Sequence, residues 1–217
     1  MNKKINISII GTRGYPYVYS GYETFVKQLS ERLVLEDCNV TVYCHKGLFD
    51  KTPKEIKGIK LVYVPTIETK ILSQPIHSFL SIIHACFSNT DVLLVVNSAN
   101  GPFGLLTKLF RIPTAINVDG LEWLRPKWKG LGSIYFKWAS KMATLFYDQI
   151  INDSEEMRKV YLNLFKRDSK VIAYGADIRK SKNPDLINAW DIKKREYYLV
   201  IGRLIPDNNA DLIIKGF

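Results

Sequence analysis

Short apolar runs alternate with longer amphipathic segments along most of the chain, and this alternation most constrains the fold. The run "VLLVV" is typical of a strand covered on both faces, because none of its side chains is polar. Strands are predicted at 5–10, 40–44, 60–64, 92–96, 114–118, 149–152 and 170–173. Helices are predicted at 22–35, 76–88, 103–110, 131–146 and 155–164, with a capping box of Asp153 and Glu156 opening the last. This order predicts an α/β fold, a doubly wound parallel sheet of the Rossmann type.

The alternation stops after Asp177. Residues 178–196 are polar and basic, as in a linker, and "YYLVIGRLIPDNNADLIIKGF" then begins another strand, turn and helix. A lone strand and helix cannot bury their apolar faces. We therefore expect a Rossmann-like domain at 1–177, a linker at 178–196 and the truncated start of a second domain at 197–217.

The charge of the chain indicates an anionic partner. Lysine and arginine number 31 against 21 acidic residues, a net charge of +10. Such an excess favours a phosphorylated substrate, an acidic membrane or nucleic acid. No apolar run approaches the roughly 20 residues of a membrane span, and the three cysteines and three histidines have no metal-ligand spacing. We therefore expect a cytoplasmic protein with reduced thiols and no metal.

A glycine-rich loop joins the first predicted strand to the first predicted helix. It contains Gly11, Gly14 and Gly21 but neither a GxGxxG nor a GK[ST] motif. Loops of this kind lie at the carboxyl end of a strand, where the helix N-terminus presents amide groups and a positive dipole to anions. Gly21 lacks a Cβ atom, so an anionic group can approach the backbone there. The loop predicts a phosphate site, although a tight turn explains Gly11 equally well.

Several separated motifs resemble one enzyme family. They are "GTRGYPYVYSGYETFV", "VNSANGPFG", "NVDGLEWLRPKW", "AYGAD" and "VIGRLIPDNNADLIIKGF". In this order they resemble GT-B glycosyltransferases of family 4, in the bacterial rhamnosyltransferase-like branch. The resemblance implies the N-terminal half of a two-domain GT-B architecture, in which 1–177 is the acceptor-side domain and 197–217 is the truncated start of the nucleotide-sugar-binding domain. It also implies retaining transfer of a sugar, with rhamnose favoured, from a nucleoside diphosphate sugar to a hydroxyl. The acceptor would be lipid-linked, in bacterial surface polysaccharide synthesis, with no cofactor beyond the donor co-substrate.

The resemblance also implies the residues of the donor site. Gly14, Gly21 and Tyr22 would lie near the donor diphosphate. Arg203 would grip the phosphates, because a guanidinium stays charged and contacts two oxygens at once. Glu23 matches the glutamate of the family's GGxE motif and would line the cleft or hinge, although in the first turn of a helix it could simply favour the helix dipole. Asn208 stands where the family commonly has lysine, so a second fixed positive charge is absent.

The acceptor side departs from the family as well. The usual cleft histidine is missing, and "INVDGLEW" offers Asp119 and Glu122 as catalytic candidates. Asp119 follows a predicted strand and is placed to orient an acceptor hydroxyl or to accept its proton. Local hydrogen bonds that close a turn are an alternative role for both carboxylates. Asp177 would line the cleft or fix the hinge between the domains.

Residues 123–147 contain no acid, and basic and aromatic residues alternate there. Such a composition suits a membrane surface. Core-facing helical spacing is predicted for Ile134, Trp138, Met142 and Leu145. The expected membrane-facing residues, which would place the protein at the inner face of the cell membrane, are Lys127, Lys129, Lys137 and Lys141.

Two other classes of protein fit part of the pattern. A nucleic-acid-binding Rossmann module would explain the charge, but the chain has no recognised RNA or DNA motif and its basic residues are dispersed. We therefore expect no nucleic-acid partner. A non-catalytic remnant would explain the short second part, if the rest of that domain never existed.

Overall fold

The computed structural model describes residues 4–17, 20–67, 69, 71–118, 120–178, 180–202, 204–205 and 208–217. These residues form one eight-stranded sheet with the order β3-β4-β2-β1-β5-β6-β7-β8. The strands are β1 (Asn6–Ile10), β2 (Asn39–His45), β3 (Glu55–Ile56), β4 (Ile59–Val64), β5 (Val92–Val96), β6 (Thr114–Val118), β7 (Gln149–Asn152) and β8 (Lys170–Val171). Neighbouring strands are parallel except for β3 and β4. The predicted doubly wound parallel sheet is confirmed.

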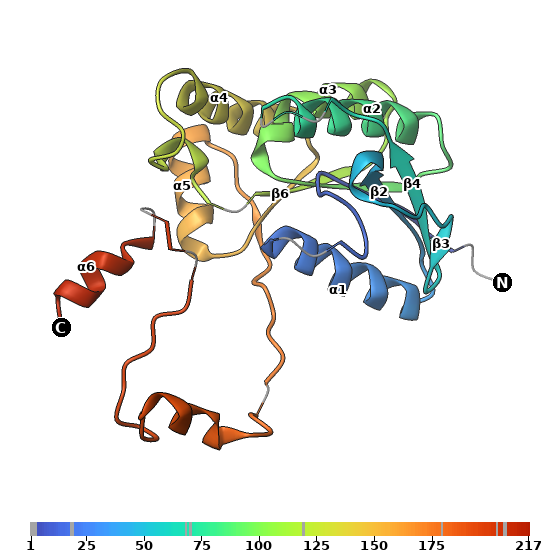
Figure 1. Ribbon diagram of the computed structural model, residues 1–217. Coiled ribbons are helices and arrows are strands. Elements are labelled where there is room, and N and C mark those ends of the chain that lie inside the picture. Colours follow the sequence, from blue (N-terminus) through green and yellow to red (C-terminus); the bar gives the residue numbers. More distant parts are fainter. Residues whose placement is uncertain are drawn as a thin grey trace.

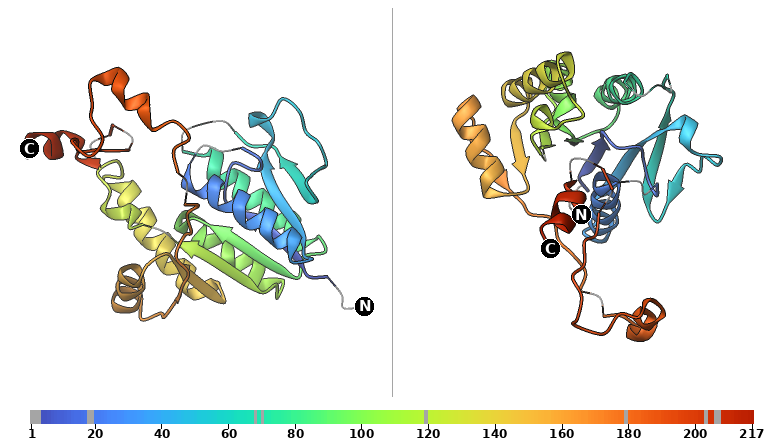
Figure 2. Two further views of the ribbon diagram at one scale, coloured as in Figure 1. Left: turned by 90° about the horizontal axis from the view of Figure 1, so that it is seen from below. Right: turned by 60° about the vertical axis from the view of Figure 1, so that its left-hand side comes forward.

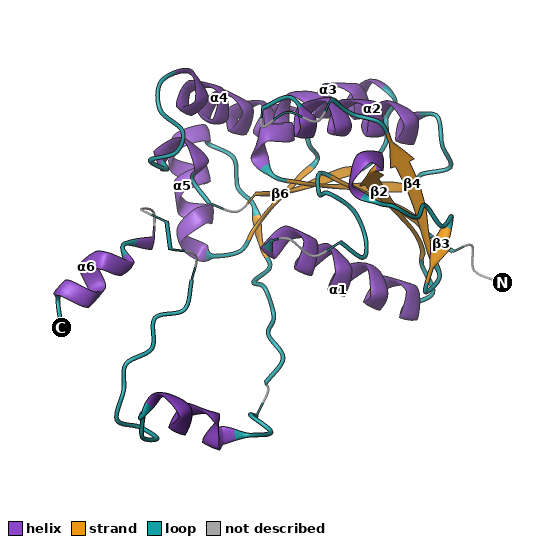
Figure 3. Cartoon of the chain, viewed as in Figure 1, coloured by secondary structure: helices purple, strands orange, loops and turns teal. Residues whose placement is uncertain are grey.

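Helices cover both faces of the sheet (Figures 1 and 3). The α-helices are α1 (Gly21–Leu35), α2 (Ser73–Cys86), α3 (Gly104–Leu109), α4 (Leu131–Phe146), α5 (Glu155–Phe165) and α6 (Ala210–Lys215). The short 3₁₀ helices are η1 (Lys46–Leu48), η2 (Ser98–Phe103), η3 (Glu122–Leu124) and η4 (Pro184–Trp190). In Figure 1, α2, α3 and α4 lie over one face and α1 lies under the other. The strand order reverses between β1 and β5, and in open α/β sheets such a switch point is where ligands bind.

The sheet is buried on both faces, as its apolar runs predict. Ile9 and Ile10 are both fully buried, yet they belong to separate core clusters on opposite faces. The same division separates Val95 from Val96 in β5. Successive side chains of a strand point to opposite faces, so a strand covered on both sides is mostly apolar.

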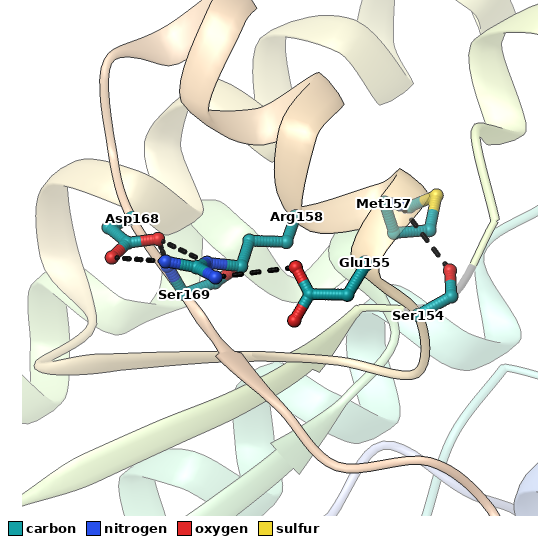
Figure 4. Close-up of polar contacts among 6 residues, drawn as sticks. All are labelled: Ser154, Glu155, Met157, Arg158, Asp168 and Ser169. Carbon is teal, nitrogen blue, oxygen red and sulfur yellow. Dashed lines mark hydrogen bonds and ion pairs between the residues drawn. The ribbon is translucent and has the colours of Figure 1, made fainter.

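Two details of the predicted elements are wrong. The two-residue strand β3 is not predicted, because it is too short to show any periodicity. The capping box predicted from Asp153 and Glu156 is also absent, since Ser154 is the N-cap of α5 and its Oγ accepts a 3.4 Å hydrogen bond from the Met157 amide (Figure 4).

An ion pair joins α5 to the turn before β8 (Figure 4). The Arg158 guanidinium donates to both carboxylate oxygens of Asp168, at 2.7 and 3.1 Å, and it reaches Glu155 at 3.3 Å. These hydrogen bonds and charges lower the pKa of Asp168. The contact links α5 to the edge of the sheet, away from the switch point.

The chain after β8 leaves the sheet and carries η4 and α6 (Figures 1 and 2). The strand predicted at 197–202 is not formed among the described residues. A strand needs a partner strand, and the described part of 172–217 contains only these two helices. The division into domain, linker and second domain stays a prediction.

Candidate functional site

Two glycines allow the loop after β1 to pack closely against the neighbouring strands β5 and β2. Gly11 and Gly14 have φ angles of +106° and +125°, which L side chains rarely adopt. A Cβ atom on Gly11 would lie 2.3 Å from the Val96 carbonyl oxygen, and one on Gly14 would lie 2.7 Å from the Cys44 side chain. Both glycines are therefore required by close packing on β5 and β2. For Gly14, this packing is a role separate from the donor contact that the sequence predicts.

Glu23 ties both ends of this loop to the first turn of α1. Its side chain is buried, with only 3% of the residue exposed. The carboxylate accepts hydrogen bonds from the backbone amides of Arg13, at 3.1 Å, and Ser20, at 2.9 Å, and from the Ser20 hydroxyl. Its negative charge also suits the positive end of the helix dipole. In this structure Glu23 holds the loop, and its place in a cleft or hinge stays a prediction.

The first turn of α1 faces open space at Gly21. A Cβ atom there would meet no atom of the described residues within 4 Å, and Gly21 is exposed. Tyr22 is half-buried and packs on the core cluster under α1. The N-terminus of a 15-residue helix thus stands open at the carboxyl edge of the sheet, beside the switch point. Such a position offers amide donors to an anion.

The motif "AYGAD" crosses the same edge of the sheet. The Tyr174 hydroxyl donates a 2.9 Å hydrogen bond to Asn117 Oδ1 in β6, and its ring lies 5.2 Å from the ring of Phe25 in α1. Asp177 follows in an exposed position. The roles of Asn117 and Tyr174 are not predicted from the sequence. The sequence signal for Asn117 is its polar side chain near the end of the otherwise largely apolar strand "TAINV".

Glu122 is fully engaged by its own segment. Its carboxylate accepts hydrogen bonds from Arg125 at 2.5 Å and from the Trp128 indole at 2.8 Å, and the Lys127 ammonium lies 3.3 Å away. Burial alone would raise the pKa of Glu122, but these bonds and charges outweigh it and hold the pKa below its usual value. This geometry fits the turn-closing alternative. Asp119 and Arg203 lie outside the described residues.

The basic residues of the predicted membrane face divide into two groups. Lys127 is paired with Glu122 and lies 5.2 Å from the centre of the Trp128 ring, so it is not free as expected. The other three lysines are exposed: Lys129, Lys137 and Lys141.

The predicted core face of α4 is wrong. Ile134, Trp138 and Leu145 are 66%, 48% and 51% exposed. The buried residues of α4 are mostly small instead: Phe136, Ala139, Ser140, Ala143 and Thr144. Small side chains are needed because α4 approaches η2 closely, so that a Cβ atom on Gly101 would lie 1.9 Å from the Ala139 carbonyl oxygen. The apolar periodicity of α4 shows where its large hydrophobic residues lie. The face that is buried is instead the one whose small residues allow α4 to approach η2 closely.

Two histidines from different elements meet beneath the loop. The rings of His45, at the end of β2, and His77, in α2, stack with centroids 3.8 Å apart, and both are buried. Burial first, and then the neighbouring His45, lowers the pKa of His77 to about 3. The sequence does not reveal this contact, because the two histidines belong to separate elements.

Metal-ligand clusters and membrane-spanning helices are both absent from the described residues. No group of three or more His, Cys, Asp or Glu side chains there is arranged to hold a metal ion. Within the same residues, no helix has the length and apolar character needed to cross a membrane.

Comparison with known families gives one match, over residues 4–177, to the family described as Domain of unknown function (DUF1972). The chain belongs to this family. No curated protein matches this DUF1972 chain.

Solved structures similar to the DUF1972 chain include three GT-B glycosyltransferases. Sucrose-phosphate synthase from Thermosynechococcus elongatus is 14% identical, with a TM-score of 0.53 over 79% of this chain and 90% of that chain. UGT2 of Phytolacca americana, complexed with UDP-2-fluoro-glucose and pterostilbene, is 11% identical, with a TM-score of 0.55 over 89% and 58%. A UDP-glucosyltransferase from Polygonum tinctorium capable of glucosylating indoxyl is 12% identical, with a TM-score of 0.52 over 89% and 57%.

These similarities establish the fold. The DUF1972 domain has the Rossmann-like architecture found in one half of GT-B glycosyltransferases. The chain spans just over half the length of the two plant enzymes.

Proposed function

We propose that this chain is the acceptor-side part of a glycosyltransferase that moves a sugar from a nucleoside diphosphate sugar to a hydroxyl group. The observation that carries the proposal is the first turn of α1, which stands open at Gly21 on the switch-point edge of a GT-B-like sheet. The similar UGT2 structure contains UDP-2-fluoro-glucose, which supports a nucleotide-sugar donor for this fold.

In this proposal, the donor diphosphate binds in front of α1. Gly14, Gly21 and Tyr22 form the N-terminal side of the site, and Arg203 reaches it from the second domain, which begins at 197. As the sugar leaves, negative charge grows on the diphosphate. Fixed amide dipoles and a guanidinium stabilise that charge more strongly in the transition state than in the bound donor.

We assign the acceptor hydroxyl to the end of β6. Asp119 follows this strand and would orient the hydroxyl or accept its proton. The sequence offers Glu122 as a second catalytic candidate. Because donors already occupy both of its carboxylate oxygens, we propose that it positions the segment 122–128, while Asp119 takes the proton.

The finer features of the proposal rest on the family 4 resemblance. They are retention at the anomeric carbon, rhamnose as the sugar, a lipid-linked acceptor and a role in bacterial surface polysaccharide synthesis. The expected reduced thiols and the basic, aromatic residues of 123–147 support a position in the cytoplasm, at the inner face of the cell membrane. Exposed Lys129, Lys137 and Lys141 on and before α4 would contact anionic lipid there.

A thermal-shift titration with UDP, GDP and dTDP tests the donor site in the protein that carries both domains. A ligand that binds only the folded state raises Tm, so one of these nucleotides should do so. Gly21→Val should abolish the rise, because the new side chain fills the space before α1. Gln28→Val, on an exposed position of the same helix, is the matched control. No rise with any nucleotide, or an unchanged rise in Gly21→Val, would overturn the proposed site.

A further inference from the structure

The helix α2 is more apolar on its exposed side than on its buried side. Its buried residues are largely polar or small: His77, Ser78, Ser81, Ile82 and Ala85. Its exposed side carries Phe79 and Leu80, with Leu72 just before the helix and Phe87, 77% exposed, just after it. The helix contains no Asp, Glu, Lys or Arg. A surface helix normally shows the opposite pattern, with its apolar stripe toward the core.

The same reversal continues over the two neighbouring helices. The exposed large apolar side chains of this region are Leu105, Leu109 and Phe110 in and after α3, and Leu131, Ile134, Trp138 and Leu145 in α4. The three helices lie over the same face of the sheet (Figure 1). The rings of Phe87 and Phe110 are 5.0 Å apart, and the Lys108 ammonium donates a 3.1 Å hydrogen bond to the Leu145 carbonyl. We call the exposed residues of α2, α3 and α4, with Leu72, Phe87 and Phe110 at their ends, the α2–α4 outer face.

The charge on this outer face has one sign. The helices α2, α3 and α4 contain no acidic residue, and their charged residues are Lys108, Lys137 and Lys141. Lys129 and Arg111, both exposed, lie just outside these helices. By contrast, α1 and α5 carry acidic and basic residues together. Of these five helices, α2, α3 and α4 therefore combine exposed apolar side chains with charge of a single sign, whereas α1 and α5 do not.

We infer that the α2–α4 outer face inserts into the surface of an anionic phospholipid membrane. Its aromatic and aliphatic side chains would enter the acyl boundary, and its lysines would extend to the lipid phosphates. The inference rests on the membrane association in the proposed function. It adds the apolar contact to the lysines of α4 and identifies the surface.

The charge pattern favours a membrane over a second copy of the chain. In a two-fold symmetric dimer the same patch meets itself, so the cationic patch of one copy faces the cationic patch of the other. Cations without acidic partners would then face cations, and such like-charge contacts are unfavourable in an interface. An anionic lipid surface complements both the charge and the apolar side chains.

Vesicle flotation tests this inference. The chain should float with phosphatidylcholine vesicles that contain phosphatidylglycerol, and part of the binding should persist at high salt, where the electrostatic attraction is screened. The triple variant Phe79→Ser, Phe87→Ser, Leu109→Ser should bind at least about tenfold more weakly at high salt, because burying one large apolar side chain is already worth that factor. The matched control is Leu35→Ser, Leu162→Ser, Leu164→Ser, three exposed leucines of α1 and α5, and it should bind like wild type.

Three results would overturn the inference. They are no flotation of wild type, equal flotation of wild type and the Phe79 triple variant, or a wild-type dimer in sedimentation that this variant abolishes without any vesicle binding. The test is separate from that of the donor site. Vesicle binding without a nucleotide-induced rise in Tm would contradict the glycosyltransferase proposal and support the membrane face. A rise in Tm without vesicle binding would contradict the membrane face and support the donor site.

Discussion

The Tyr174 hydroxyl donates a 2.9 Å hydrogen bond to Asn117 Oδ1, and this bond fastens the segment after β8 to the end of β6. The Tyr174 ring also contacts Phe25, so the same side chain joins β6 to α1. The segment that leads out of the family domain is thus held at the edge where we place the substrates. Any movement of the chain after Asp177 would pivot near this contact.

Loss of the Tyr174 hydroxyl should weaken this attachment. Tyr174→Phe removes the hydrogen bond and leaves the Asn117 amide oxygen without that donor, which should lower the free energy of unfolding by about 1 kcal/mol. Urea denaturation measures the change. Tyr198→Phe is the control, because Tyr198 is exposed and its ring contact with Phe217 needs no hydroxyl. Equal stability of Tyr174→Phe and Tyr198→Phe would show that the bond does not anchor the segment.

Removal of the Glu23 carboxylate should be more costly. Glu23→Ala leaves the Arg13 amide, the Ser20 amide and the Ser20 hydroxyl without their acceptor at a buried site. We expect a loss of about 2–3 kcal/mol in unfolding free energy, as for hydrogen bonds to a charged group. Glu23→Gln keeps one acceptor oxygen and should lose less, whereas Gln28→Ala on the same helix should change stability little. If Glu23→Ala unfolds at the wild-type urea concentration, the carboxylate does not hold the loop.

Acid should destabilise the fold through His77. Its pKa falls from 6.5 to about 3 on folding, so below pH 6.5 the unfolded chain binds a proton that the folded chain does not. Above pH 6.5 His77 is neutral in both states and does not change the free energy of unfolding. As the pH falls from 6.5 toward 3, this free energy decreases by about 1.4 kcal/mol per pH unit. In His77→Gln this part of the slope should vanish, as measured by urea unfolding across that range. Parallel slopes in wild type and variant would contradict it.

The sequence predicts the sheet better than it predicts the site. The strands β5, β6 and β7 are predicted at their observed residues, because each is built around a short run of apolar residues, and β5 is apolar throughout. The stacking of His45 on His77 depends instead on how α2 is placed against β2, and no local pattern contains that information. The face of α4 is wrongly predicted for a related reason. Its core side is chosen by the close approach to Gly101, which favours small residues over large ones.

The donor site should respond to loss of positive charge. In the protein with both domains, Arg203→Ala should lower kcat/KM for sugar transfer by a factor corresponding to about 2–4 kcal/mol, as for a fixed donor that acts on the leaving group. The same assay with residues 1–217 alone should show no transfer, because the proposal divides the donor contacts between two domains. Arg195→Ala, an exposed position in the predicted linker, is the control. Unchanged kcat/KM in Arg203→Ala, or turnover by 1–217, would contradict the two-domain site.

Charge reversal on α4 should release the protein from anionic vesicles at low salt. Changing Lys129, Lys137 and Lys141 to Glu alters three exposed side chains, and each basic residue near an anionic surface is worth about 1 kcal/mol. Lys127 is left unchanged because it pairs with Glu122. Wild type should sediment with phosphatidylglycerol-containing vesicles and bind less as salt increases, since the Debye length falls to about 3 Å at 1 M.

The control for this charge reversal alters the same net charge elsewhere. Lys159, Lys180 and Lys182 are exposed and lie outside α2, α3 and α4, so their change to Glu should weaken binding far less. The comparison separates a specific face from a general effect of net charge, because both triple variants lose the same amount of positive charge. If the two variants bind equally weakly, attraction to lipid comes from the charge of the whole molecule. If both bind like wild type, the lysines of α4 make no contact with the membrane, and only the apolar side chains of the α2–α4 outer face can account for binding.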